Sequence, residues 1–153
     1  MSTTKNSGIL DGLDVHGVLE LDLVDESGAV LRTFIDKNLV VNSGLQLLST
    51  VLATDVLNRI GVGTNGAAAA GGDVAPLANQ WTKAFDSIDH PTADSTRFNF
   101  TIAANECNGM VIREFGLLFI DGETQVLFSR KGEKSIEKTS SFSIAGRWTI
   151  TIN

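Results

Sequence analysis

The stretch Phe142–Ile152, which reads Phe-Ser-Ile-Ala-Gly-Arg-Trp-Thr-Ile-Thr-Ile, indicates the fold class of this chain. Its large apolar side chains occupy even-numbered positions, and its polar side chains occupy odd-numbered positions. A period of two is typical of a β-strand that buries one face. We therefore predict a strand here, with Trp148 in a hydrophobic core.

The same pattern continues outward from this strand. Phe98–Ile102 alternates in the same way, and Asn108-Gly109 is a strong turn signal before an apolar strand predicted over Met110–Ile120. Asp121-Gly122 then turns the chain into a strand at Val126–Phe128. The long strand is apolar on both sides, which predicts a place in the middle of a sheet or under a partner. Strict alternation puts Val111, Phe115, Leu117 and Phe119 on one face and Ile112, Leu118 and Ile120 on the other.

The N-terminal half adds a hairpin, a helix and a further short strand. Val15–Leu23 and Val30–Ile35 read as two strands joined by the turn residues Asp25–Gly28. Ser43 with Gln46 matches a capping box, and the leucines that follow at helical spacing predict one short helix over about 43–53. Another strand is expected around residues 58–62. We thus predict a mainly β protein, a β-sandwich or jelly-roll-like single domain over 15–153.

Two segments lack the apolar residues needed for a core. Residues 1–14 are polar and contain several glycines, which predicts a flexible N-terminal arm. Residues 63–75 are mostly glycine, alanine and small polar residues, which predicts a mobile loop. The arm is expected to gain order only against a partner, and the loop, like the arm, can gain order in an assembly.

The composition argues against several partners. The chain has 153 residues, a formal net charge of −6 and a pI of about 4.8. A phosphate-binding surface would oppose this charge, so no nucleic-acid partner is expected. Lys131–Lys138 is locally basic, but its interleaved glutamates predict a solvated loop or strand edge. Polar residues interrupt every apolar run, so no membrane partner is expected either.

Residues that carry chemistry are sparse. Cys107 is the single cysteine, and with only His16 and His90 the chain cannot assemble a Cys/His zinc cluster. A cysteine nucleophile needs a cation or a histidine to lower its pKa, and only proximity in the fold would bring one to Cys107. Gly61–Gly66 matches Gly-x-Gly-x-x-Gly, but no amphipathic helix follows it. We predict no metal, no cofactor and no enzymatic activity.

Carbohydrate binding stays open as an alternative function. β-Sandwich proteins often present aromatic rings to sugars, and Trp81 is the candidate ring. Tyrosine, the commonest amphipathic contact residue, is absent from the chain.

Short segments of the chain resemble parts of bacteriophage tail and baseplate-associated structural proteins. The resemblance covers roughly Asn38 to Asn153. It is carried by Asn38–Leu45, Ile60–Thr64, Ile112–Phe119, Leu127–Arg130, Lys138-Thr139 and Trp148–Ile150. It implies a virion protein, assembled in the host cytoplasm, and carries no catalytic residues. Unlike long tail fibres, the protein is expected to have no shaft or receptor-binding tip after the final strand, which favours a collar, baseplate, fibre-adaptor or head-decoration role.

The expected function is therefore non-enzymatic assembly, as a symmetric multi-copy part of the tail, baseplate or collar, with head decoration as an alternative. Expected partners are copies of the same chain and other virion proteins. The two segments predicted to gain order supply the expected contact residues, which are Ser2, Thr3, Thr4, Lys5, Asn6, Gly63, Thr64, Asn65 and Gly66.

Overall fold

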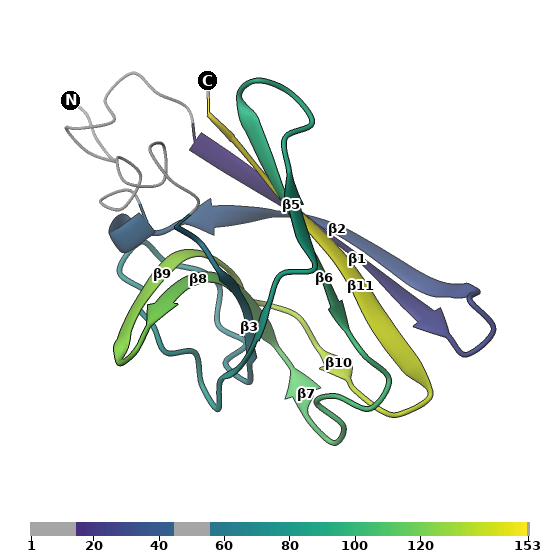
Figure 1. Ribbon diagram of the computed structural model, residues 1–153. Helices are drawn as coiled ribbons and strands as arrows, with labels where there is room; N and C mark the ends of the chain where they lie inside the picture. The colour runs from purple at the N-terminus through teal and green to yellow at the C-terminus, as the bar shows by residue number, and fades with distance from the viewer. Residues whose placement is uncertain (1–14, 45–55, 153) are drawn as a thin grey trace.

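The computed structural model describes residues 15–44 and 56–152, and β-strands dominate these residues (Figure 1). Nine strands form one antiparallel sheet in the order β4-β3-β8-β9-β2-β1-β11-β6-β5, and two short strands, β7 and β10, pair separately. The strands are β1 Val15–Asp25, β2 Val30–Val40, β3 Arg59–Gly63, β4 Trp81–Ala84, β5 Ser87–Asp89, β6 Ser95–Ile102, β7 Val111–Ile112, β8 Glu114–Asp121, β9 Thr124–Lys131, β10 Ile136–Glu137 and β11 Phe142–Ile152. The predicted mainly β fold is confirmed.

The long sheet curls so that its two halves enclose one core. The main cluster of buried residues contains side chains from β1, β6 and β11 in one half and from β3, β8 and β9 in the other. β2 joins the halves, because it pairs with β1 on one side and with the end of β9 on the other. The result is sandwich-like, and Figure 1 shows β8 and β9 as a layer apart from β1, β2 and β11.

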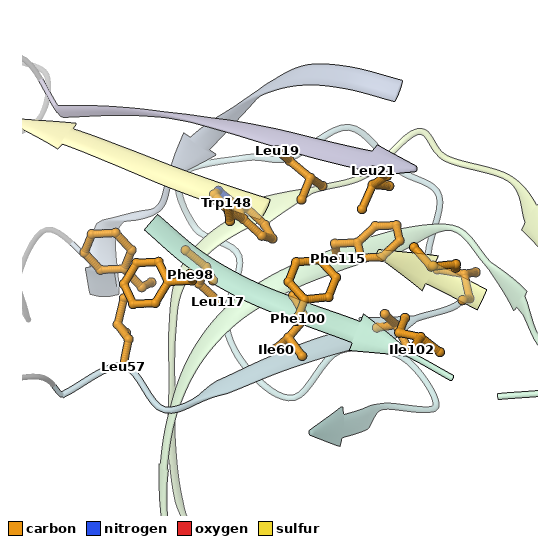
Figure 2. Packing of buried hydrophobic residues seen from close by; sticks show 14 of the residues in the cluster. Leu19, Leu21, Leu57, Ile60, Phe98, Phe100, Ile102, Phe115, Leu117 and Trp148 are labelled. Atoms are coloured by element: carbon orange, nitrogen blue, oxygen red, sulfur yellow. The ribbon is translucent and has the colours of Figure 1, made fainter. Parts of the chain in front are cut away.

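β11 forms the centre of the first half and has the alternation predicted for it. It pairs with β1 from Val15↔Ile152 to Asp25↔Phe142 and with β6 on its other side. Trp148 is 0% exposed, as predicted. Figure 2 shows its ring near Leu19 and Phe98 in the space between the layers.

The hairpin of β1 and β2 closes at the predicted turn. The carboxylate of Asp25 accepts hydrogen bonds from the backbone N–H of Ser27, from the Ser27 hydroxyl and from the backbone N–H of Ala29. These bonds, that of the Ser27 hydroxyl first, lower the pKa of Asp25. Gly28 has φ of +90°, a conformation that glycine adopts without steric cost.

The strand predicted over Met110–Ile120 is broken at Arg113, so that part of the prediction is wrong. The Arg113 N–H donates to the carbonyl of Gly63, and the Arg113 carbonyl accepts from the N–H of Lys134. The chain therefore leaves β7 and starts β8 in a new register. As a consequence Ile112 lies in the same core as Phe115, although strict alternation had placed it on the opposite face.

β8 lies in the middle of the sheet, between β3 and β9, as predicted. Its second face is covered by the chain itself. Leu118 is 0% exposed and packs with Val41, Leu77 and Leu127 in a smaller cluster. Both faces of β8 are therefore apolar because each packs against other residues of the same chain.

The predicted helix is described only where it begins. Residues 42–44 are helical, and the rest of the predicted span 43–53 lies outside the described residues, as does the arm 1–14. The Ser43 hydroxyl donates to the carbonyl of Leu127, and Gly44 packs so closely on the Phe128 carbonyl that a Cβ atom would not fit. This helical turn therefore packs against β9 and is hydrogen-bonded to it.

Candidate functional site

The open edge of β2 is the clearest candidate for a contact surface. β2 pairs with β1 from Asn38 to Val30, but with β9 only through Leu39↔Arg130 and Val40↔Ser129. Among the described residues, no strand pairs with the other side of residues 30–38. Figure 1 shows the β1–β2 hairpin projecting past the layer of β8 and β9. Backbone N–H and C=O groups on such an edge can pair with another strand.

The same strand exposes most of the large apolar side chains at the described surface. Four of the five exposed large hydrophobic residues lie on β2, and we call these four the β2 strip. They are Val30 at 56%, Leu31 at 58%, Ile35 at 67% and Leu39 at 41% exposure, whereas the fifth, Val74 at 67%, lies elsewhere. Gathered apolar side chains on an open sheet edge are typical of an interaction site.

The other face of β2 carries alternating charges. The Arg32 guanidinium lies 4.3 Å from the centroid of the Phe34 ring, and Lys134 Nζ lies 4.6 Å from the same centroid. Lys134 Nζ also lies 2.6 Å from the carboxylate of Asp36. Among the described residues, Asp36 thus has an ion-pair partner and Arg32 has a ring contact only. β2 therefore carries the apolar strip on one face, and a cation at Arg32 and an anion at Asp36 on the other.

The contact residues predicted from the sequence lie elsewhere or outside the described chain. Ser2 to Asn6 lie outside the described residues. The backbone groups of Gly63 to Gly66 bond within the chain, because Thr64 N–H donates to Ala78, Asn65 N–H donates to Glu114, and the Gly66 carbonyl accepts from Glu133. The predicted contact role of these residues stays a prediction. The β2 strip was missed, although the valine, leucine and isoleucine in Val30–Ile35 were its visible signal.

A buried ion pair holds the glycine- and alanine-rich loop. Glu114 is 1% and Arg130 is 2% exposed, and 2.8 Å separates Arg130 Nε from Glu114 Oε1. Glu114 Oε2 accepts from the N–H groups of Asn65 and Ala78, and Arg130 also donates to Asp73 at 3.0 Å. A buried charge is tolerated only when it is paired and hydrogen-bonded in this way. The mobility of residues 63–75 stays a prediction. The contacts with Glu114 and Arg130 restrain the loop at Asn65 and Asp73.

Cys107 and Lys138 form a second polar cluster beside an open pocket of about 280 Å³, lined by Asn108–Val111 and Glu137–Ser140. Lys138 is 1% exposed, and its Nζ donates to the Ala104 carbonyl, the Asn108 side chain and the Thr139 carbonyl. The prediction of a solvated Lys131–Lys138 loop is therefore wrong at Lys138. The chain segment folds inward there, because three oxygen acceptors compensate the buried ammonium group.

This environment makes Cys107 a poor nucleophile. Burial raises the pKa of the Cys107 thiol to about 11, and the charge of Lys138 offsets the effect of burial only in part. Burial also lowers the pKa of Lys138. Only the thiolate form attacks electrophiles, and it is scarce at neutral pH when the pKa is this high. The fold thus brings a cation to Cys107 without activating it.

We expect Cys107 to be alkylated slowly in the folded protein. With a pKa near 11 in place of 9.0, the thiolate fraction at neutral pH falls about a hundredfold. The measurement is the rate of iodoacetamide modification between pH 7 and 11, followed by mass spectrometry, with the urea-unfolded chain as control. A folded-state rate that levels off near pH 8 would contradict the raised pKa.

The remaining candidates are scattered. Trp81 lies on β4 at one end of the sheet, and its half-buried side chain packs against the main core, so part of the ring is not available to a sugar. His16 lies on β1, and His90 Nδ1 lies 3.3 Å from the Ser95 carbonyl. Within residues 15–44 and 56–152, no three His, Cys, Asp or Glu side chains are grouped to hold a metal ion. In the same residues, no helix has the length and apolarity to cross a membrane.

The chain was compared with protein-family models, curated proteins and solved structures. None of the protein-family models, curated proteins or solved structures with which the chain was compared matches it.

Proposed function

We propose that this chain is a non-enzymatic structural component of a bacteriophage particle, present in several copies in the tail, baseplate or collar. The β2 strip is the observation that supports this proposal most directly. It combines a strand edge that no other described strand covers with four exposed large apolar residues in one short segment. The resemblance of Asn38–Asn153 to phage tail and baseplate-associated proteins is the reason for proposing a phage particle as the assembly.

The β2 strip favours assembly for an energetic reason. Covering apolar surface contributes roughly 25 cal/mol per Å², and strand pairing satisfies the backbone groups at the edge. One short edge gives a modest contact, but many copies in a symmetric particle multiply its effect. The rest of the fold suits this role. The two halves of the sheet share one buried core, and Glu114 and Arg130 hold the glycine- and alanine-rich loop through Asn65.

A lysine substitution in the β2 strip is expected to reduce incorporation into particles. Ile35→Lys places a charge where assembly would remove water, whereas Val74→Lys changes a residue of equal 67% exposure outside the strip. The measurement is quantitative mass spectrometry of purified particles from phage that encode each variant, with immuno-electron microscopy to locate the chain. We expect at least about a tenfold loss for Ile35→Lys, corresponding to about 1.4 kcal/mol, and near-normal occupancy for Val74→Lys.

Two outcomes would contradict the proposal. Wild-type chain absent from purified particles would remove the virion role. Equal occupancy of both variants would remove the β2 strip as the assembly surface.

A further inference from the structure

We infer that the partner at the β2 strip is a second copy of the same chain, which pairs β2 with β2 in antiparallel orientation about a two-fold axis at Phe34. The inference rests on the proposed function in treating the strip as an assembly surface, and it adds the identity of the partner and the register. The resulting contact would join two curled sheets through their open edges.

The extent of the open edge limits where the axis can lie. Residues 30–38 have no partner on this side among the described strands, and Phe34 is the middle residue of that stretch. An antiparallel two-fold pairing about residue 34 places Arg32 opposite Asp36 and Thr33 opposite Ile35. β2 has a bulge at Leu31, where its pairing with β1 steps from Arg32 to Val30, so the regular pairing extends from Arg32 to Asp36. The pairing ends where β9 begins to occupy the edge at Leu39.

Charge complementarity supports this register. Arg32 and Asp36 lie on the same face of β2 as Phe34, so each Arg32 would face Asp36 of the other copy, twice in the dimer. Opposite charges directly across two strands stabilise the pairing, and like charges destabilise it. In the single copy, the Arg32 guanidinium has only the Phe34 ring among the described residues, so it is free to form the new pair. An axis moved to Ile35 would place Arg32 opposite Asn38 and remove this match.

The outer face supports the same register. Ile35 of one copy would oppose Thr33, and the two Ile35 side chains would be diagonal neighbours within reach of each other. Leu31 would lie near the aliphatic stem of Lys37 of the other copy. The edge is also rigid, because Thr33 donates to Asp22 on β1 and the Asp25 turn closes the hairpin. Little conformational entropy is therefore lost when the second copy binds.

A charge-reversal experiment tests both partner and register. Arg32→Asp alone would place two acidic residues opposite each other at both ends, and Asp36→Arg alone would place two arginines there. When the two variants are mixed, every such pair becomes opposite in charge. We expect each single variant to dimerise about thirtyfold more weakly than wild type, and the equimolar mixture to form a heterodimer at near wild-type affinity.

Sedimentation velocity over a concentration series, with native mass spectrometry to count heterodimers, measures these affinities on the full chain. Lys37→Asp is the control, because it reverses an exposed charge that would face Leu31, so Asp36→Arg should not rescue it. Melting temperatures at concentrations below dimer formation check that each variant folds, since Asp36→Arg also removes the ion pair with Lys134.

The results separate this inference from the proposed function. Wild-type chain that stays monomeric, or a mixture no tighter than its components, overturns the second-copy pairing even if Ile35→Lys is lost from particles. Charge rescue in solution with wild-type chain absent from particles overturns the virion role and leaves the pairing intact.

Discussion

Replacing Glu114 by alanine is expected to lower the free energy of unfolding by about 3–5 kcal/mol. The substitution leaves the guanidinium of Arg130, 2% exposed, without its buried carboxylate partner, and it removes the acceptor for the N–H groups of Asn65 and Ala78. Urea unfolding followed by tryptophan fluorescence measures the change. Hydrogen exchange at Asn65 and Ala78 should accelerate in the same variant.

An exposed ion pair supplies the matched control for Glu114. Glu133 lies 3.7 Å from Lys131 with its side chain 61% exposed, so Glu133→Ala should cost less than about 1 kcal/mol. Glu114→Ala combined with Arg130→Met should recover part of the lost stability, because the unpaired charge is gone. A loss below about 1 kcal/mol for Glu114→Ala would mean that water reaches Arg130 and that the pair does not hold the loop.

Replacing Trp148 by alanine is expected to cost about 3–5 kcal/mol of unfolding free energy. The side chain is 0% exposed and fills the space between the two layers near Leu19, Phe98 and Phe100 (Figure 2). Its removal leaves a cavity that the surrounding strands fill only partly. Thermal and urea unfolding followed by circular dichroism measure the loss without depending on the missing fluorophore.

Trp148→Phe separates packing from hydrogen bonding at this position. The buried Nε1 of Trp148 has no hydrogen-bond partner among the described residues, so phenylalanine loses volume but no hydrogen bond. We expect a cost well below that of alanine. Trp81→Ala, at a half-buried site on β4, should also cost less. Equal losses for Trp148→Phe and Trp148→Ala would indicate that the indole N–H bonds to a group outside the described chain.

Much of the candidate site could not be predicted from the sequence, for reasons visible at particular residues. The sequence predicts a strand at Val30–Ile35, but whether its apolar side chains are covered depends on the path of β9, which pairs with β2 only at Leu39 and Val40. Lys138 lies in a charged segment and is nevertheless buried, because its ammonium group reaches the carbonyl of the distant Ala104 as well as that of the adjacent Thr139. The apolar residues of Val30–Ile35 are visible in the sequence, but neither their exposure nor the burial of Lys138 can be read from composition or spacing.

By itself, the sequence determined the local elements of this protein. The alternation in Phe142–Ile152, the turn at Asp25–Gly28 and the Asp121-Gly122 turn each depend on neighbours a few residues apart, so short-range sterics and the exclusion of apolar side chains from water were enough. Only the tertiary structure decided the break at Arg113, the pairing of Glu114 with Arg130 and the exposure of Ile35. Each of these three depends on which distant segment lies beside the residue, and that placement is fixed by packing the whole sheet around one core.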